Sequence, residues 1–204
     1  MKKTLNDQGF TLIELLVVLM ILTIVGGVAL GIITGTLRGI NKASSVNNIR
    51  QNGNYALSQI SKTIAYAQNF CGVSTDNNPG ILNNSCDVNG TNGSTYITDC
   101  PSTSTTVYKY IRVQSFDGGT TVYSCNGQTD SPPYTIASNG ASLVDSSLYV
   151  TNCQILCNGS GTGVSPLVTI SFTVQTFNPL NPAQLAEQKS SLDFETSVQP
   201  RNSN

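Results

Sequence analysis

One carboxylate in this sequence has no obvious counter-charge. Glu14 is the single charged residue in the apolar run from Phe10 to Ile33. An ionised acid in hydrocarbon is costly unless it is paired or neutralised, so an acid in such a run is a functional candidate by default. No Lys or Arg lies between Lys3 and Arg38. The partner of Glu14 therefore has to come from outside this stretch of side chains.

The cysteine thiols are the second set of side chains that could form bonds or bind a metal. Six cysteines follow the apolar run, and an even count in an oxidising compartment predicts three disulfides out of fifteen possible pairings. A zinc site is the alternative, but the sequence has neither a paired C-x-x-C spacing nor a histidine. Proximity along the chain gives the pairing that we expect: Cys71 with Cys86, Cys153 with Cys157, and Cys100 with Cys125.

The remaining composition excludes most catalytic chemistry. The chain has no histidine and no tryptophan, 10% charged residues and a formal net charge of −1 over 204 residues. Ser–His, Cys–His and His–metal sites are thus absent. A nucleic-acid binder normally carries a basic stripe, and no Lys/Arg cluster appears after Lys62. We expect no catalytic residue, no resident metal or cofactor, and no nucleic-acid partner.

Three weaker patterns have simpler interpretations. Asp193 and Glu195 are two apart, so they share one face of a strand, where solvated carboxylates are the simpler reading than a catalytic pair. Residues 159–163 are glycine-rich, but no Lys-Ser/Thr follows, which favours a flexible connection over a phosphate loop. Residues 87–93 resemble part of a calcium loop without its sixth-position glycine or its final glutamate.

The apolar run from Phe10 to Ile33 is long enough to cross a membrane as a helix. As a helix, its twenty-four residues extend about 36 Å, against about 30 Å for a hydrocarbon core. Lys2 and Lys3 precede it, so the N-terminus should stay cytoplasmic and the rest of the chain should be exported. A plain membrane anchor is the simplest alternative. A signal peptide fits poorly, because its apolar core is shorter and a small-x-small cleavage site is missing.

Helical spacing continues beyond the apolar run. Apolar residues recur every three or four positions with Asn, Gln and Ser between them, which predicts an amphipathic continuation over residues 34–70. We expect one helix from about residue 10 to about residue 69, with Gly53 as a soft point and with its second half laid against a sheet. Five glycines between Gly26 and Gly39 predict either close helix packing or a stretch that unwinds.

Residues 71–204 predict a β-rich head. Residues 71–106 are rich in Gly, Asn, Ser, Thr and Pro and predict a long loop, with a short strand at 96–98. Beyond them, β-branched and aromatic runs and an Asp-Gly-Gly turn predict a hairpin and three further strands in an antiparallel meander. The expected strands cover residues 107–116, 120–124, 147–156, 167–177 and 192–198. The predicted fold class is α+β.

The first residues resemble a known family. Met1 to Gly9, followed by Phe-Thr-Leu-Ile-Glu-Leu-Leu-Val-Val from Phe10, is similar to the leader and helix start of type IV prepilins and type II secretion pseudopilins. The resemblance implies cleavage between Gly9 and Phe10 by a prepilin peptidase and N-methylation of Phe10. It also implies that Glu14, fifth in the mature chain, pairs with the new α-ammonium of a neighbouring subunit inside a filament.

The same resemblance implies a role and a location. The domains would be a leader at 1–9, a transmembrane helix at 10–33, its amphipathic continuation at 34–70 and a disulfide-containing head at 71–204. The chain would be a structural subunit, working with other pilins and an inner-membrane assembly platform, first in the cytoplasmic membrane and then in an extracellular or periplasmic filament. Size, disulfides and the C-terminal ending favour a minor pilin or a J-like pseudopilin. The alternatives are a pilus-tip adhesin and an anchored extracellular hydrolase.

Overall fold

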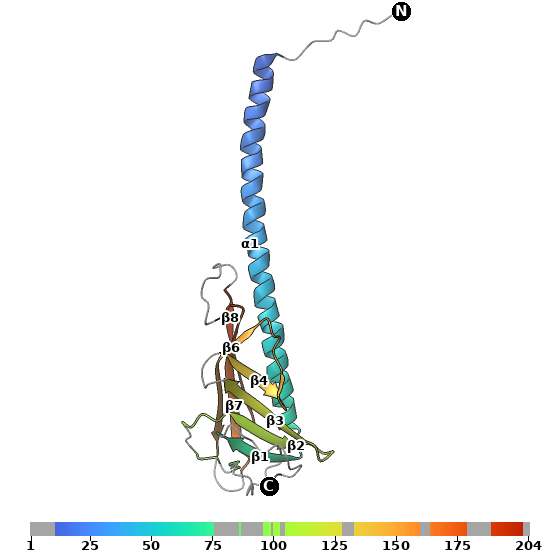
Figure 1. The fold of residues 1–204 in the computed structure, drawn as a ribbon, viewed down its shortest axis with the longest axis vertical. Helices are drawn as coiled ribbons and strands as arrows, with labels where there is room; N and C mark the ends of the chain where they lie inside the picture. The colour runs from blue at the N-terminus through green and yellow to red at the C-terminus, as the bar shows by residue number, and fades with distance from the viewer. Residues whose placement is uncertain are drawn as a thin grey trace, which may run out of the picture. The chain divides into compact units, whose positions relative to one another are not determined.

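The computed structural model shows one long helix followed by a β-sheet (Figure 1). It describes residues 11–75, 86, 96–98, 100–102, 105–127, 133–159, 164–178 and 189–201. Gly9 and Phe10, where cleavage and methylation are predicted, lie outside the described residues. The chain divides into two compact units, Met1–Asn41 and Lys42–Asn204.

Helix α1 comprises Leu12–Ala65. It contains no proline, and it is helical through all five glycines from Gly26 to Gly39, so the unwound alternative does not apply to this state. The helix ends four residues before the predicted limit of about residue 69. After it, the chain makes a last turn at Tyr66, whose N–H bonds the carbonyl of Lys62, and then enters the first strand.

The strands form an antiparallel sheet in the order β1-β2-β3-β4-β6-β7-β8, with β5 paired to β4. The path follows chain order, with β5 alone lying off it, and every pair is antiparallel, which confirms the predicted meander and the α+β class. The bounds are β1 Asn69–Ser74, β2 Tyr110–Gln114, β3 Thr120–Gly127, β4 Tyr134–Ser138, β5 Ala141–Ser142, β6 Tyr149–Asn158, β7 Leu167–Gln175 and β8 Ser191–Val198.

Five of these strands were predicted and three were not. The hairpin β2–β3 and strands β6, β7 and β8 lie where the β-branched and aromatic runs predicted strands. Strands β1, β4 and β5 were missed, and the long loop predicted from residue 71 is wrong at its start, where β1 runs to Ser74. Within residues 96–98, where a short strand was predicted, Ile97 makes an isolated antiparallel bridge to Val73 of β1.

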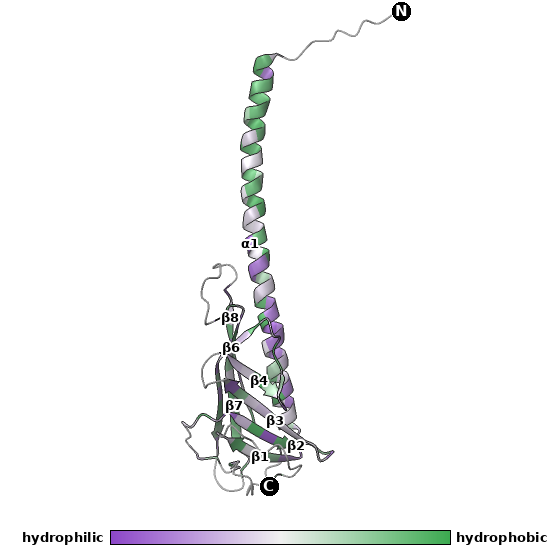
Figure 2. Cartoon of the chain, in the orientation of Figure 1, coloured by the Kyte–Doolittle hydropathy of each residue, from purple (hydrophilic) through white to green (hydrophobic). Residues whose placement is uncertain are grey.

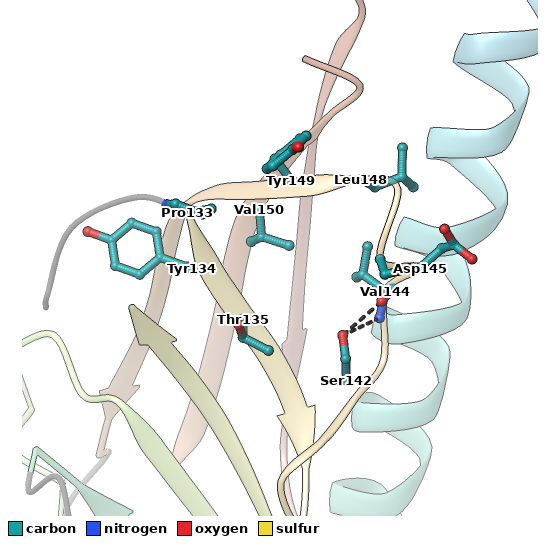
Figure 3. A pocket seen from close by; sticks show the side chains of 10 residues that line it. Pro133, Tyr134, Thr135, Ser142, Val144, Asp145, Leu148, Tyr149 and Val150 are labelled. Carbon is teal, nitrogen blue, oxygen red and sulfur yellow. Dashed lines mark hydrogen bonds between the residues drawn. The ribbon is translucent and has the colours of Figure 1, made fainter. Parts of the chain in front are cut away.

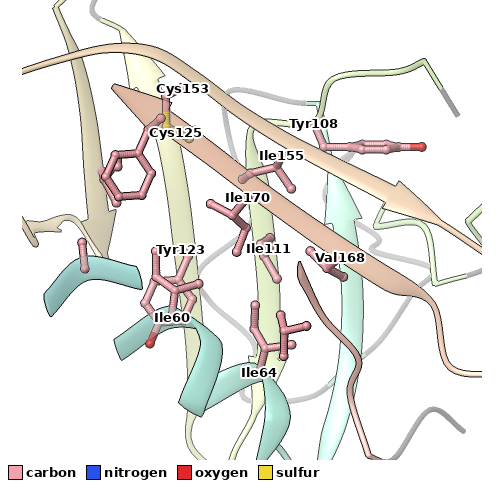
Figure 4. Close-up of a cluster of buried hydrophobic side chains, with 14 of the residues drawn as sticks. Ile60, Ile64, Tyr108, Ile111, Tyr123, Cys125, Cys153, Ile155, Val168 and Ile170 are labelled. Carbon is pink, nitrogen blue, oxygen red and sulfur yellow. A yellow bond between two sulfur atoms is a disulfide. The ribbon is translucent and has the colours of Figure 1, made fainter. Parts of the chain in front are cut away.

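The core of the second unit lies between one helix face and the sheet (Figure 4). The buried helix positions have spacings of three and four residues, as expected for one face: Ile49, Gly53, Ala56, Ile60 and Ile64. Opposite them, Ile111, Ile170 and Phe172 are almost fully buried. This packing confirms that the second half of the predicted helix is amphipathic and covers a sheet.

Gly53 is a packing position and not the predicted soft point. A Cβ at Gly53 would lie 2.2 Å from Cζ of Phe194 in β8, far inside van der Waals contact. Phe194 also stacks on Phe172 in β7, with ring centroids 5.5 Å apart. The absence of a side chain at Gly53 therefore lets β8 approach the helix closely.

All six cysteines are in disulfides, but two of the three predicted pairings are wrong. The bonds are Cys71–Cys86, Cys100–Cys157 and Cys125–Cys153. Only Cys71–Cys86 was predicted. Cys153 and Cys157 are both in β6, and four residues of strand extend about 13 Å, beyond the roughly 7 Å that a disulfide can bridge. Cys125 instead joins β3 to β6.

A bulge in β6 turns Cys153 toward the core. Between Thr151 and Gln154 the register against β7 shifts, so Asn152 and Cys153 share the place of one residue. Asn152 has φ of 55°, a left-handed conformation that asparagine tolerates better than most residues. Before the bulge an even-numbered residue, Val150, points inward, and after it the odd-numbered residues do. Cys153 is therefore buried and bonded to Cys125.

Candidate functional site in the apolar part of helix α1

Glu14 lies in the first turn of α1. The residue before the helix, Thr11, offers its carbonyl to the N–H of Glu14 at 3.1 Å and to that of Leu15 at 3.3 Å. The Thr11 hydroxyl donates to the Glu14 carboxylate at 3.4 Å. A negative side chain in this turn is stabilised by the unpaired N–H groups and the positive end of the helix dipole. Local structure thus holds the carboxylate at the start of the helix.

The side chains that follow Glu14 have the character expected of a membrane-spanning segment (Figure 2). Every residue from Thr11 to Asn41 is exposed, including large apolar ones such as Leu12, Met20 and Ile32. Among the described residues, α1 is the helix that is long and apolar enough to cross a bilayer. So large an exposed apolar surface requires lipid or other protein around it.

Polar side chains in this segment are satisfied within the helix. The hydroxyls of Thr23, Thr34 and Thr36 donate to backbone carbonyls three or four residues earlier, at 2.8–3.1 Å. A hydroxyl bonded in this way exposes no unpaired donor to an apolar surrounding. Glu14 is therefore the one side chain between residues 11 and 37 whose charge still needs a partner.

The second unit offers a hollow of about 310 Å³ that sequence reasoning did not anticipate (Figure 3). It lies between β4, the start of β6 and the loop that joins β5 to β6, and its wall is mainly apolar. Tyr134 and Tyr149 belong to the lining, with Asp145 among the polar members. Hydrogen bonds from the Ser147 side chain and backbone hold the pKa of Asp145 below its usual value.

Asp193 and Glu195 both lie on the exposed side of β8, as their spacing predicted. The Thr173 hydroxyl donates to Asp193 at 2.6 Å across the strand pair. Within the described part of the chain, no cluster of three or more His, Cys, Asp or Glu side chains could hold a metal ion. Residues 87–93, which resemble part of a calcium loop, lie outside the described residues, as do residues 160–163 of the glycine-rich stretch.

A helix with a buried amphipathic half, an exposed apolar half and an acid in its first turn, joined to an antiparallel sheet, defines a pilin-like architecture. Residues 4–30 match the family model for the prokaryotic N-terminal methylation motif, which is the hallmark of type IV prepilin-like proteins. Neither a curated protein nor a solved structure matches the chain.

The match covers Gly9, Phe10 and Glu14 together with most of the apolar run. A prepilin motif implies processing by a prepilin peptidase and assembly with other pilin subunits, and it fits a chain anchored in a membrane by its N-terminal helix. Proteins with this motif are structural subunits and not catalysts. The sequence resemblance to prepilins is thereby confirmed.

Proposed function

We propose that this chain is a prepilin that is cleaved between Gly9 and Phe10, methylated at Phe10 and assembled through α1 into a type IV pilus or a type II secretion pseudopilus. The observation that carries the proposal is the methylation motif at residues 4–30, followed by an exposed apolar helix with one acid in its first turn. The chain enters the membrane with its N-terminus inside and has no catalytic role.

Glu14 supplies the electrostatic part of this proposal. Cleavage before Phe10 creates an α-ammonium, and in a surrounding of low dielectric constant that cation and the Glu14 carboxylate of a neighbouring subunit attract strongly. An unpaired end is penalised, so the pairing sets the axial register between subunits. The Thr11 contact and the helix dipole keep the acid near the helix start, where it can meet such a partner.

The experiment combines mass spectrometry with two substitutions at one position. The mature chain should begin at a methylated Phe10, and Glu14→Gln should lower incorporation into filaments about tenfold, since it removes a charge paired in an apolar place. Glu14→Asp keeps the charge and should retain part of the incorporation. Asp117→Asn removes a carboxylate from the exposed β2–β3 turn and serves as the matched control. An intact Met1 in assembled material would contradict the proposal.

Within this class we propose a minor subunit, on the grounds of head size and disulfide content. Immunogold labelling of filaments tests this placement. Label in sparse clusters of neighbouring copies, or clustered at one end, is expected, whereas uniform label along the filament would indicate a major subunit.

Ligand binding by the head is the second candidate function. The hollow in Figure 3 supports it, because two tyrosines and several polar residues line a concave place. Tyr134→Ala with Tyr149→Ala should then abolish attachment to a surface while filament numbers stay unchanged. Unchanged attachment would leave the head with a purely structural role.

A further inference from the structure

Charge is separated along the second unit. Residues 42–75 contain three cations, Lys42, Arg50 and Lys62, and no carboxylate. Residues 76–204 contain nine carboxylates against four cations. The helix therefore contributes positive charge to the unit and the remainder of the unit is net negative.

The helix surface opposite the core is cationic and aromatic. Tyr55, Lys62 and Tyr66 follow one another at spacings of seven and four residues, so they share one side of the helix, and all three are exposed. The guanidinium of Arg201 lies 4.9 Å from the centre of the Tyr66 ring and adds a second positive charge beside Lys62. We call Tyr55, Lys62, Tyr66 and Arg201 the cationic helix face.

The sheet surface on the other side is acidic. Phe194 points at Gly53 of the helix, so its neighbours Asp193 and Glu195 point to the opposite side of the sheet. There they border a mostly polar hollow of about 290 Å³ that also includes Asn152 of the β6 bulge. Ser171 and Thr173 of β7 complete its polar lining. We call these five residues the acidic sheet face.

We propose that the cationic helix face of one copy of this chain docks on the acidic sheet face of a second copy. The hollow between Asp193, Glu195 and Asn152 has room for a Lys or Arg head group, which would make charge-assisted hydrogen bonds there. Tyr55 and Tyr66 supply apolar area around the charges. Two different surfaces meet in this contact, so it is heterologous.

The position of the two faces determines what such a contact builds. They lie on opposite sides of the two-layer unit, one on the helix and one on the sheet. A heterologous contact between opposite sides repeats from copy to copy and, if the rotation does not close a ring, produces an open helical row. This inference rests on the proposed filament function and extends it, because it requires at least two neighbouring copies and excludes a subunit present once per filament.

Because one chain carries two surfaces of opposite charge, a second copy of the chain is a better occupant of the cationic helix face than a lipid or polymer phosphate. Lipid phosphates or an anionic polymer would use the helix cations but would leave the acidic sheet face without a role. A second copy uses both faces at once, and like charges placed opposite each other would then prevent docking.

The test is a charge exchange in the full-length chain, in cells that assemble filaments. Lys62→Glu and Glu195→Lys should each lower incorporation about tenfold, since each places like charges in contact. The double variant K62E/E195K restores opposite charges and should recover most of the loss. Asp117→Lys makes the same charge change as Glu195→Lys on the exposed β2–β3 turn, at a residue that belongs to neither face, and should have little effect. Non-reducing electrophoresis checks that the three native disulfides form in every variant.

A cross-linking experiment reports the contact directly. All native cysteines are in disulfides, so a short bismaleimide reacts with introduced thiols alone. In sheared filaments it should join the variant K62C/E195C into a ladder of multimers, while K62C/D117C should give monomers.

Each outcome of the two experiments is decisive. Absence of recovery in the double variant, or absence of a ladder when the chain is present in filaments, would overturn the docking proposal and leave the proposed function intact. If Lys62→Glu is harmful and Glu195→Lys is not, the helix cations serve a lipid or polymer phosphate. If the wild-type chain is missing from filaments altogether, the proposed function itself fails, and the docking proposal fails with it.

Discussion

Helix α1 is one continuous element whose two parts obey different physical constraints. From Leu12 to Asn41 every side chain is exposed, and the five glycines have no atom within 4 Å of the place where a Cβ would lie. From Lys42 to Ala65 one face is buried against the sheet, and Gly53 has no room for a Cβ at all. The same residue type is thus unconstrained in one part and required in the other.

The two parts of the helix obtain their stability from different contacts. The first part is held by its own backbone hydrogen bonds, and its apolar surface awaits lipid or other subunits. The second part is fixed by tertiary contacts with strands more than a hundred residues away in sequence, such as β7 and β8. Substitutions in the first part should therefore change assembly, and substitutions on the buried face of the second part should change the stability of the head.

The largest expected effect is the loss of the Phe194 ring. Phe194→Ala removes the contacts with Gly53 and Phe172 and should lower the free energy of unfolding by about 3–5 kcal/mol. Urea unfolding of the full-length chain in detergent, followed by near-ultraviolet circular dichroism of the head tyrosines, measures it. Leu22→Ala deletes a similarly apolar but exposed side chain and should leave the transition unchanged. A shift in that control would show that the two parts are not independent.

The next largest effect is expected from the Cys125–Cys153 bond. Replacing both cysteines by alanine opens a loop of 28 residues between β3 and β6 and should cost about 2–4 kcal/mol. Cys71→Ala with Cys86→Ala opens a loop of 15 residues and should cost somewhat less. The same urea titration compares the two pairs. Equal stability of the wild type and the first variant would argue that the bond does not form in solution.

Two glycines of the same helix should respond oppositely to one substitution. Gly53→Ala forces its Cβ against Phe194 and should destabilise the head by about 1–3 kcal/mol. Gly35→Ala meets open space and favours the helix by about 1 kcal/mol, without altering the unfolding of the head. Because Phe194→Leu shortens the opposing side chain, it should relieve part of the Gly53→Ala defect. Additive losses in the double variant would mean that the two residues do not compete for space.

The smallest expected effect is a pH dependence at Tyr123. Burial raises the pKa of this phenol, and its hydroxyl donates to Thr63 of α1 at 2.8 Å. Because the pKa is higher in the folded chain, the stability that this group contributes is present below its unfolded pKa of about 10 and is lost as the pH rises above that value.

Tyr123→Phe tests this expectation. The variant should lose about 1 kcal/mol at neutral pH. It should also show a smaller decline between neutral and alkaline pH than the wild type does. Tyr66→Phe changes an exposed tyrosine that does not act on the Tyr123 phenol and is the control. Parallel declines for the wild type and Tyr123→Phe would assign the alkaline loss to other groups.

Much of the fold follows from local sequence. The twenty-four-residue apolar run, the spacing of apolar residues after Arg38 and the Asp-Gly-Gly turn predict a long helix and a hairpin, because periodicity and turn chemistry act over a few residues. Strand β1 was missed because it contains Gly72. That glycine has φ of +110° at a register shift, and a Cβ there would lie 2.6 Å from the Ile97 carbonyl oxygen. In the sequence, a glycine that is needed because a neighbouring backbone comes close looks the same as a glycine in a loop.

The candidate site was found from sequence for a related reason. Glu14 stands out against its immediate neighbours, and the residues around it match a motif that is continuous in sequence. The two charged faces of the second unit could not be found in this way. They combine Tyr66 with Arg201, and Asn152 with Glu195, and only folding brings such pairs together.

Local sequence is enough to predict the apolar helix, the acid at its start and the processing motif, since each depends on residues within a short span of chain. The pairing of the cysteines, the bulge at Asn152 that directs Cys153 inward, and the space at Gly53 for Phe194 become visible in the folded chain alone. These features depend on the register between strands and on the separation of helix and sheet. Those quantities are set by the packing of distant segments and leave no periodic signal in the chain.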